Sequence, residues 1–124
     1  YMTFYAFSTE NWKRSAFEVG KIMDLFRKYL EEMEEREQEN EEAGYNIHFI
    51  GSRAGMPSDI AELMDVVEAR SSDKNKIYIN IAVNYGGRAE IVHAVKRLSK
   101  RIESGELSSD DITEKAISDN LYTA

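Results

Sequence analysis

The sequence predicts an α/β protein with an open, mostly parallel sheet and helices on both faces. Along the 124 residues, the spacing of apolar side chains alternates between that of strands and that of helices. The predicted order is strand, helix, strand, helix, strand, helix, followed by a short helix. Such alternation favours parallel strands that are joined by right-handed helical crossovers.

The first strand is predicted over residues 2–7, MTFYAF, which form a continuous apolar and β-prone run. A helix follows from about residue 15, because Ser15 and Glu18 have the S-x-x-E spacing of a capping box. We expect the acidic segment 31–42 to continue this helix in solvent. Gly44 is expected to end it. The apolar stripe of this helix has the i, i+3, i+4 pattern and consists of Val19, Ile22, Met23, Phe26, Leu30 and Met33.

The remaining elements follow in the same alternation. Residues 45–51 predict the second strand, and a helix is expected from Ser58. Residues 76–87 predict the third strand, and the long helix after it should end near Gly105. A short helix from about Ser109 closes the chain. One face of the third strand is apolar and carries Ile77, Ile79, Ile81 and Val83. We expect a single domain over residues 1–124.

Composition excludes several classes of function. The chain has 16 basic and 23 acidic residues and a net charge of −7, which argues against nucleic acid as a partner. It has no cysteine, so a disulfide framework and a thiolate metal site are both excluded. His48 and His93 lack metal-ligand spacing, so a histidine metal site is not expected. No apolar run reaches the ~18 residues of a membrane span. We expect a soluble, cytoplasmic protein.

Two polar clusters follow predicted strands. Residues 8–14, STENWKR, come after the first strand, and residues 84–88, NYGGR, come after the third. Ligands bind outside the carboxyl ends of strands in open parallel sheets, so both clusters should lie at one ligand-binding edge. A plainer alternative is that Trp12 packs over the helix, Glu10 pairs with Arg14 and Ser8 caps a turn.

The order of these motifs resembles that of the cis-prenyltransferases, most closely the bacterial undecaprenyl diphosphate synthases. The resemblance lies in YAFSTENWKR at 5–14, EVGKIMDLF at 18–26, FIG at 49–51, NIAVNYGGRAEI at 80–91 and AISDNLYTA at 116–124. It implies that residues 1–124 are the central portion of a cis-prenyltransferase catalytic domain.

The activity that this resemblance implies is prenyl chain elongation. Such enzymes condense isopentenyl diphosphate with an allylic diphosphate such as farnesyl diphosphate, and each new double bond is cis. The product is a long polyprenyl diphosphate, such as undecaprenyl diphosphate for the lipid carrier of cell-wall synthesis. The resemblance implies that Mg²⁺ is the cofactor and that the enzyme is a homodimer. It also implies that the enzyme contacts the membrane peripherally through its lipid product.

The resemblance also implies roles for individual residues. Asn11 matches the family's catalytic proton acceptor, but a neutral carboxamide is a very weak base, so we interpret Asn11 as positioning the substrate or a diphosphate oxygen. The implied substrate-binding residues are Ser8, Thr9, Glu10, Trp12 and Arg14. The implied lining of a product tunnel is Ala6, Val19, Met23, Phe26, Ile77 and Val83. Several relatives have alanine at the position of Val83, so a narrower tunnel and a shorter product are one expectation.

Some family features are not found in this sequence. The family's D-G-N-G-R-W segment, which carries the metal-binding aspartate, and its R-T-S-G-E segment are both absent from this sequence. The resemblance therefore implies no metal ligand within residues 1–124, with the Mg²⁺ ligands in those missing segments, and residues 1–124 alone are expected to be inactive. Ser15 stands where relatives usually have proline. Two alternative functions stay open: a non-catalytic interaction subunit of a cis-prenyltransferase complex, and an unrelated doubly wound binding protein that recruits partners through its acidic helix. The complete STENWKR motif argues against the first.

Overall fold

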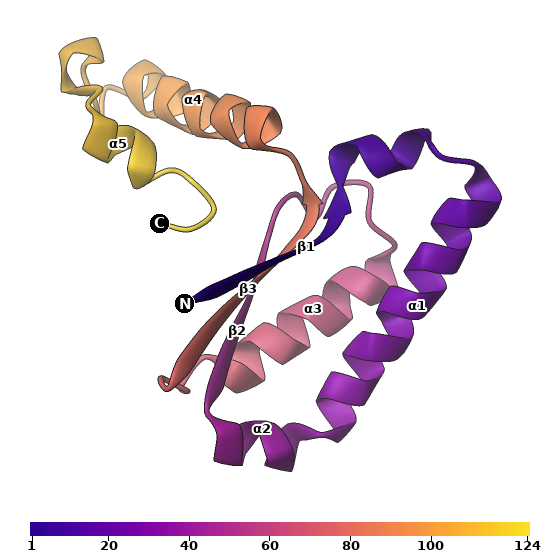
Figure 1. The fold of residues 1–124 in the computed structure, drawn as a ribbon. Coiled ribbons are helices and arrows are strands. Elements are labelled where there is room, and N and C mark those ends of the chain that lie inside the picture. Colours follow the sequence, from indigo (N-terminus) through magenta and orange to yellow (C-terminus); the bar gives the residue numbers. More distant parts are fainter. The chain divides into compact units, whose positions relative to one another are not determined.

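We describe a computed structural model of the protein, which covers the backbone of all 124 residues and every side chain except that of Glu37. The chain divides into two compact units, Tyr1–Asn84 and Tyr85–Ala124. The first unit holds the sheet and the helices that pack on it (Figure 1). Its elements are β1 (Met2–Ser8), a 3₁₀ helix (Thr9–Lys13), α1 (Ala16–Glu35), α2 (Glu37–Ala43), β2 (Tyr45–Ile50), α3 (Ser58–Ser71) and β3 (Ile77–Tyr85), the last residue of which begins the second unit.

The three strands of the described chain form one open parallel sheet in the order β1-β3-β2 (Figure 1). The register of β2 on β3 runs from Tyr45 opposite Ile77 to Ile50 opposite Ala82. The predicted α/β class with a parallel sheet is therefore confirmed. Helices α1 and α3 cover one face of the sheet. Helices on the other face, and a single domain over the whole chain, stay predictions.

The core of the first unit lies between that face of the sheet and the two helices. Ile60 and Met64 of α3 and Leu30 of α1 are almost completely buried. The rings of Phe26 and Phe49 meet edge to face, with centroids 6.3 Å apart. Periodicity predicted the inward positions of Phe26 and Leu30 correctly, because burial of an apolar stripe is what holds a helix on the sheet. Met33, the last member of the same predicted stripe, is instead exposed. The other buried members of this core are Phe7, Met23, Ile47, Met56, Val67 and Val83.

The acidic segment does not continue the first helix as expected. The helix breaks at Arg36, and α2 begins at the next residue. Like charges three and four residues apart weaken a helix that has no apolar stripe to hold it. The break also lets acidic side chains meet cations: Glu34 pairs with Arg70 at 3.2 Å, and Glu41 pairs with Lys74 at 3.6 Å. Gly44 ends α2 with a φ of 70°, as predicted.

The second unit contains α4 (Gly87–Glu103), a 3₁₀ turn (Ser109–Asp111) and α5 (Glu114–Ser118). Its buried carboxylate, Glu90, accepts hydrogen bonds from the Tyr85 hydroxyl at 2.6 Å and from the Tyr122 backbone N–H at 2.8 Å. Burial, and then the charge of Glu90, raise the pKa of the Tyr122 hydroxyl. His93 stacks on Tyr122 with ring centroids 5.0 Å apart. In the described helices of both units, no stretch is apolar and long enough to cross a bilayer.

Candidate functional site

The loop after β1 is an ordered turn. The Ser8 backbone N–H donates to the Asn11 side-chain oxygen at 2.8 Å, and the Arg14 N–H donates to the Asn11 carbonyl at 3.1 Å. Ser15 then caps α1, since its hydroxyl accepts from the Glu18 N–H at 3.3 Å and the Ser15 N–H donates to the Glu18 carboxylate at 3.2 Å. The predicted capping box is confirmed. The turn and the cap together fix where residues 8–14 stand at the carboxyl end of β1.

Trp12 is held from two sides. Its ring meets the buried Phe7 ring edge to face, with centroids 5.1 Å apart and planes at 80°. Its indole N–H donates to the side-chain oxygen of Asn84 at 2.8 Å. About a third of Trp12 (37%) is still exposed. The side chain is therefore an oriented aromatic surface at the sheet edge.

Asn84, the first residue of the second polar cluster, meets the loop after β1 through Trp12 at the edge where it was expected. Its side-chain NH₂ donates to the carbonyls of Ser52 at 2.9 Å and Ala54 at 3.0 Å, in the loop between β2 and α3. The Ser52 N–H donates back to the Asn84 carbonyl at 3.2 Å. Asn84 was expected at this edge in a mainly architectural role, and its partners Trp12, Ser52 and Ala54 were not predicted. Its only local signal was an asparagine before two glycines, a residue type that tolerates positive φ.

Arg14 and Glu10 lie on the exposed side of this loop. Arg14 pairs with Glu18 at 3.5 Å, one helical turn away, with both side chains about half exposed. The alternative in which Arg14 pairs with Glu10 is therefore wrong, because the partner of Arg14 is Glu18. Hydrogen bonds from Ser15 lower the pKa of the Glu18 carboxyl, and the charge of Arg14 adds to this. An exposed pair of this kind is weak, so Arg14 remains available to an anion.

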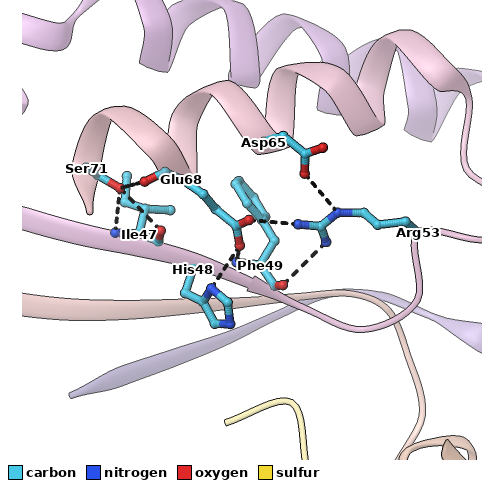
Figure 2. Close-up of polar contacts among 7 residues, drawn as sticks. All are labelled: Ile47, His48, Phe49, Arg53, Asp65, Glu68 and Ser71. Carbon is cyan, nitrogen blue, oxygen red and sulfur yellow. Dashed lines mark hydrogen bonds and ion pairs between the residues drawn. The ribbon is translucent and has the colours of Figure 1, made fainter. Parts of the chain in front are cut away.

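The loop between β2 and α3 is anchored by an ionic cluster that sequence spacing did not reveal (Figure 2). Glu68 of α3 pairs with Arg53 at 3.0 Å and with His48 Nδ1 at 2.9 Å, and it accepts from the Phe49 N–H. Arg53 also donates to the Phe49 carbonyl at 3.3 Å and pairs with Asp65 at 3.5 Å. Because Glu68 and Arg53 belong to different elements, no local pattern in the sequence indicated the cluster.

A cavity of about 710 Å³ lies under the helices of the first unit. Its walls come from the sheet and from α1, α2 and α3. The apolar residues that line it are Phe4, Tyr29, Met33, Ala43, Tyr45, Ile47, Val67, Ile79 and Ile81. Charged residues from α1, α2, α3 and the segment before β3 line it as well: Glu32, Glu34, Arg36, Glu39, Glu41, Arg70 and Lys74. The cavity therefore combines an apolar lining with a strongly charged one.

The residues predicted to line a product tunnel belong to a different set. Met23 and Val83 are buried in the core with Phe7, and Val19 and Phe26 pack against that core, while Ala6 and Ile77 are exposed. Among the described side chains, neither these six nor residues 8–14 line the cavity. Along α1, Met23 lies between the loop at one end and the cavity residues Tyr29 and Met33 at the other. The tunnel assignment stays a prediction.

The described residues do not fit a metal site. The side chains that the structure describes include no group of three or more His, Asp or Glu that could hold an ion.

Comparison with known proteins identifies the family of this chain. A sequence profile described as "Putative undecaprenyl diphosphate synthase" matches residues 1–124. The chain belongs to this family. The resemblance on which the sequence analysis rested is thereby confirmed.

Individual members of the family agree with this assignment. The chain is 37% identical over 123 residues to an isoprenyl transferase of Caulobacter vibrioides, covering 99% of this chain and 46% of that protein. Lavandulyl diphosphate synthase from Lavandula x intermedia, crystallised with dimethylallyl diphosphate, has a TM-score of 0.89 and 27% identity over 98% of this chain and 51% of its own. A probable undecaprenyl diphosphate synthase from Campylobacter jejuni has a TM-score of 0.81 and 29% identity, over 97% of this chain and 54% of its own. The chain thus spans about half the length of the relatives it matches.

Proposed function

We propose that the intact polypeptide containing this chain elongates a prenyl chain by condensing isopentenyl diphosphate with an allylic diphosphate such as farnesyl diphosphate. In each cycle the allylic C–O bond breaks and diphosphate leaves. A C–C bond forms to the isopentenyl unit, which loses a proton. The observation that carries this proposal is the ordered polar loop Ser8–Arg14 at the carboxyl edge of a sheet whose helix-covered face borders a cavity with apolar and charged walls. Family membership supports it.

Arg14 would bind the diphosphate of such a substrate, and Trp12 would contact its isoprenoid chain. A guanidinium is a permanent cation with a planar fork of donors that matches diphosphate oxygens. The Trp12 ring offers an apolar surface to the first isoprenoid carbons, and its orientation is already fixed by Phe7 and Asn84. Ser8, Thr9 and Glu10 would contact the substrate from the same turn.

Asn11 would act as a donor of hydrogen bonds. Its side-chain oxygen already accepts from the Ser8 N–H, so within the described chain the NH₂ group is the part left for a ligand. A carboxamide is far too weak a base to remove the proton by itself. The NH₂ group would therefore hold a diphosphate oxygen or the isopentenyl unit, and the proton would pass to a diphosphate oxygen.

Cofactor, assembly and location belong to the proposal as well. Family membership favours Mg²⁺, and we propose that its protein ligands lie outside residues 1–124, because the family segment with the metal-binding aspartate is not found in this sequence. We propose a homodimer in the cytoplasm that contacts the membrane through its lipid product. An undecaprenyl diphosphate for cell-wall carrier synthesis is the product we propose.

The test is an elongation assay on the full-length protein with labelled isopentenyl diphosphate, farnesyl diphosphate and Mg²⁺. We expect cis-polyprenyl diphosphates to form without any second subunit. In Arg14→Ala the KM for the diphosphate substrates should rise about tenfold or more, because a charge-assisted hydrogen bond is lost. Lys21→Ala is the control, since Lys21 lies on α1 over the Phe17 ring and outside the loop. Absence of elongation by the full-length protein alone would favour the non-catalytic subunit instead.

A further inference from the structure

Asn84 lies near the carboxyl end of β3 in a conformation that suits few residues. Its backbone φ is +49°, and among the residues that the structure describes no other non-glycine residue has a positive φ. Its exposed fraction is only 7%. Asparagine adopts the left-handed region more readily than most residues. The backbone conformation alone therefore limits which amino acids fit at position 84.

The hydrogen-bond partners of the Asn84 side chain limit further which amino acids fit at this position. An indole N–H can only donate, and a backbone carbonyl can only accept. Asn84 meets one donor, Trp12 Nε1, and two acceptors, the carbonyls of Ser52 and Ala54, at 2.8–3.0 Å. Only a group with both an acceptor and a pair of donors satisfies all three, and a carboxamide is such a group. These partners also fix which way the amide points.

The same contacts join two loops that are distant in sequence. Trp12 is 72 positions from Asn84, and Ser52 is 32 positions from it. The Ser52 N–H adds a bond to the Asn84 carbonyl at 3.2 Å. One buried side chain therefore ties the loop after β1 to the loop after β2, and both loops stand at the carboxyl edge of the sheet.

We propose that Asn84 is a positioning residue of the prenyl-transfer site: it holds the Trp12 indole in one orientation at the sheet edge and locks the β2–α3 loop against it. This inference rests on the proposed function for its kinetic consequence but not for its geometry. Asn84 does not touch substrate and acts through Trp12. Its loss should weaken binding of the isoprenoid part of the substrate more than it slows the chemical step.

The geometric test uses the indole N–H of Trp12 in the full-length protein. Its resonance is assigned as the ¹H–¹⁵N signal that disappears in Trp12→Phe. In Asn84→Gly, which keeps the positive φ, the signal should shift and its hydrogen should exchange at least about tenfold faster than in the wild type, because the bond to Asn84 is gone. Asn84→Asp still accepts from the indole but cannot donate to Ser52 and Ala54, so the β2–α3 loop amides should exchange faster. An unchanged indole signal in Asn84→Gly would overturn the inference.

Asn46 provides a matched control. Its side-chain NH₂ also donates to two backbone carbonyls, those of Ser72 at 3.2 Å and Lys74 at 3.0 Å, but near the amino end of β2. Asn46→Asp removes the same kind of contact far along the strand from Trp12. It should leave the indole signal and the kinetic constants as they are. A similar indole shift in Asn46→Asp would mean that the effect is a general loosening of the fold, and the inference would fail.

The kinetic test separates positioning from a purely structural role. Asn84→Gly should raise the KM for the allylic substrate about three- to tenfold with a smaller change in kcat. Trp12→Phe should also raise this KM, and the effect of the double variant should be smaller than the sum of the two single effects, because both substitutions remove the bond between the indole and Asn84. Additive effects, or a lowered Tm with an unchanged KM, would contradict positioning. If the wild type shows no elongation, the proposed function fails, while the indole measurement still decides the role of Asn84.

Discussion

Gly51, the residue that follows β2, must be a glycine for two separate reasons. Its φ is +123°, and an added Cβ would lie 2.1 Å from the carbonyl oxygen of Val83. We therefore expect Gly51→Ala to destabilise the full-length protein by at least about 2 kcal/mol in chemical denaturation, through backbone strain and steric overlap together.

Gly55 is the control for this substitution. It also has a positive φ, +83°, but an added Cβ would meet nothing within 4 Å. Gly55→Ala should cost only the backbone strain, about 1–2 kcal/mol. Equal losses in the two variants would show that the close approach of Gly51 to Val83 contributes nothing.

Single residues of the site were predictable where they lie next to one another in the chain. The loop Ser8–Arg14 was recognisable by its mixture of polar and aromatic side chains after an apolar strand, and it stands at the sheet edge as expected. Asn84 was expected at the same edge, but its partners were not predicted, because they lie 30 or more positions away in other elements. The contacts of Glu68 were not predicted either, because they depend on how α3 packs on β2, which no local pattern encodes.

At the scale of elements, β2 is an edge strand of the described sheet whose outer edge is covered by side chains of α3. Ser71, completely buried, accepts from the Ile47 N–H at 3.0 Å, and Glu68 accepts from the Phe49 N–H. An unpaired strand edge invites association with other chains, so this cover also protects against edge pairing. Figure 2 shows both contacts along the strand.

Removal of the Ser71 hydroxyl should therefore lower the free energy of unfolding. In Ser71→Ala the Ile47 N–H is left buried without a partner, and we expect a loss of about 1–3 kcal/mol in free energy of unfolding. Ser72→Ala is the control, because Ser72 is exposed and its hydroxyl donates only to the Ala69 carbonyl. It should stay within about 0.5 kcal/mol of the wild type. A neutral Ser71→Ala would mean that water satisfies the strand edge equally well.

The start of α1 gives a prediction about pH. Hydrogen bonds from Ser15 lower the pKa of Glu18 below its ordinary value of 4.5. A depressed carboxyl pKa adds stability that is present above the ordinary pKa and is lost as the pH falls through the folded value. Ser15→Ala should therefore destabilise the protein at neutral pH, by about 1 kcal/mol for a lost N-cap. The difference from wild type should shrink below pH 4.5 in denaturation series.

Glu18→Gln serves as the reference background for this measurement. The carboxamide that replaces the Glu18 carboxyl does not titrate, so adding Ser15→Ala to this variant should give a difference that stays constant with pH. If the difference varies with pH to the same extent in both backgrounds, a group other than Glu18 is responsible.

Element order was predictable, and the helix break was not. The capping box, the apolar stripes and Gly44 each act over a few residues, and each predicted an element end correctly. The acidic side chains on the two sides of the break at Arg36 pair with Arg70 and Lys74, which lie far along the chain. Helix periodicity describes neither these contacts nor the like charges within the segment, so it could not place the break.

For the whole molecule, the sheet order β1-β3-β2 decides which residues share a site. With β3 in the centre, Asn84 stands beside the loop after β1 and the loop after β2 at once. The same order places Ile79 and Ile81 of β3 under α1, α2 and α3, where they line the cavity. The polar loop Ser8–Arg14 thus lies at the carboxyl end of the sheet. The cavity lies along the same strands, below the helices.

If this cavity receives the growing chain, its size should influence product length. Met33 of α1 lines the cavity and is 37% exposed, whereas Leu25 of the same helix is 53% exposed and lies outside the described lining. In the full-length protein, Met33→Ala should move the product distribution toward longer chains by about one five-carbon unit, because close-packed walls leave little other room. Leu25→Ala should leave it unchanged. Chain lengths are read by mass spectrometry of the dephosphorylated products. Identical distributions for Met33→Ala and wild type would mean that the chain ends before it reaches α2.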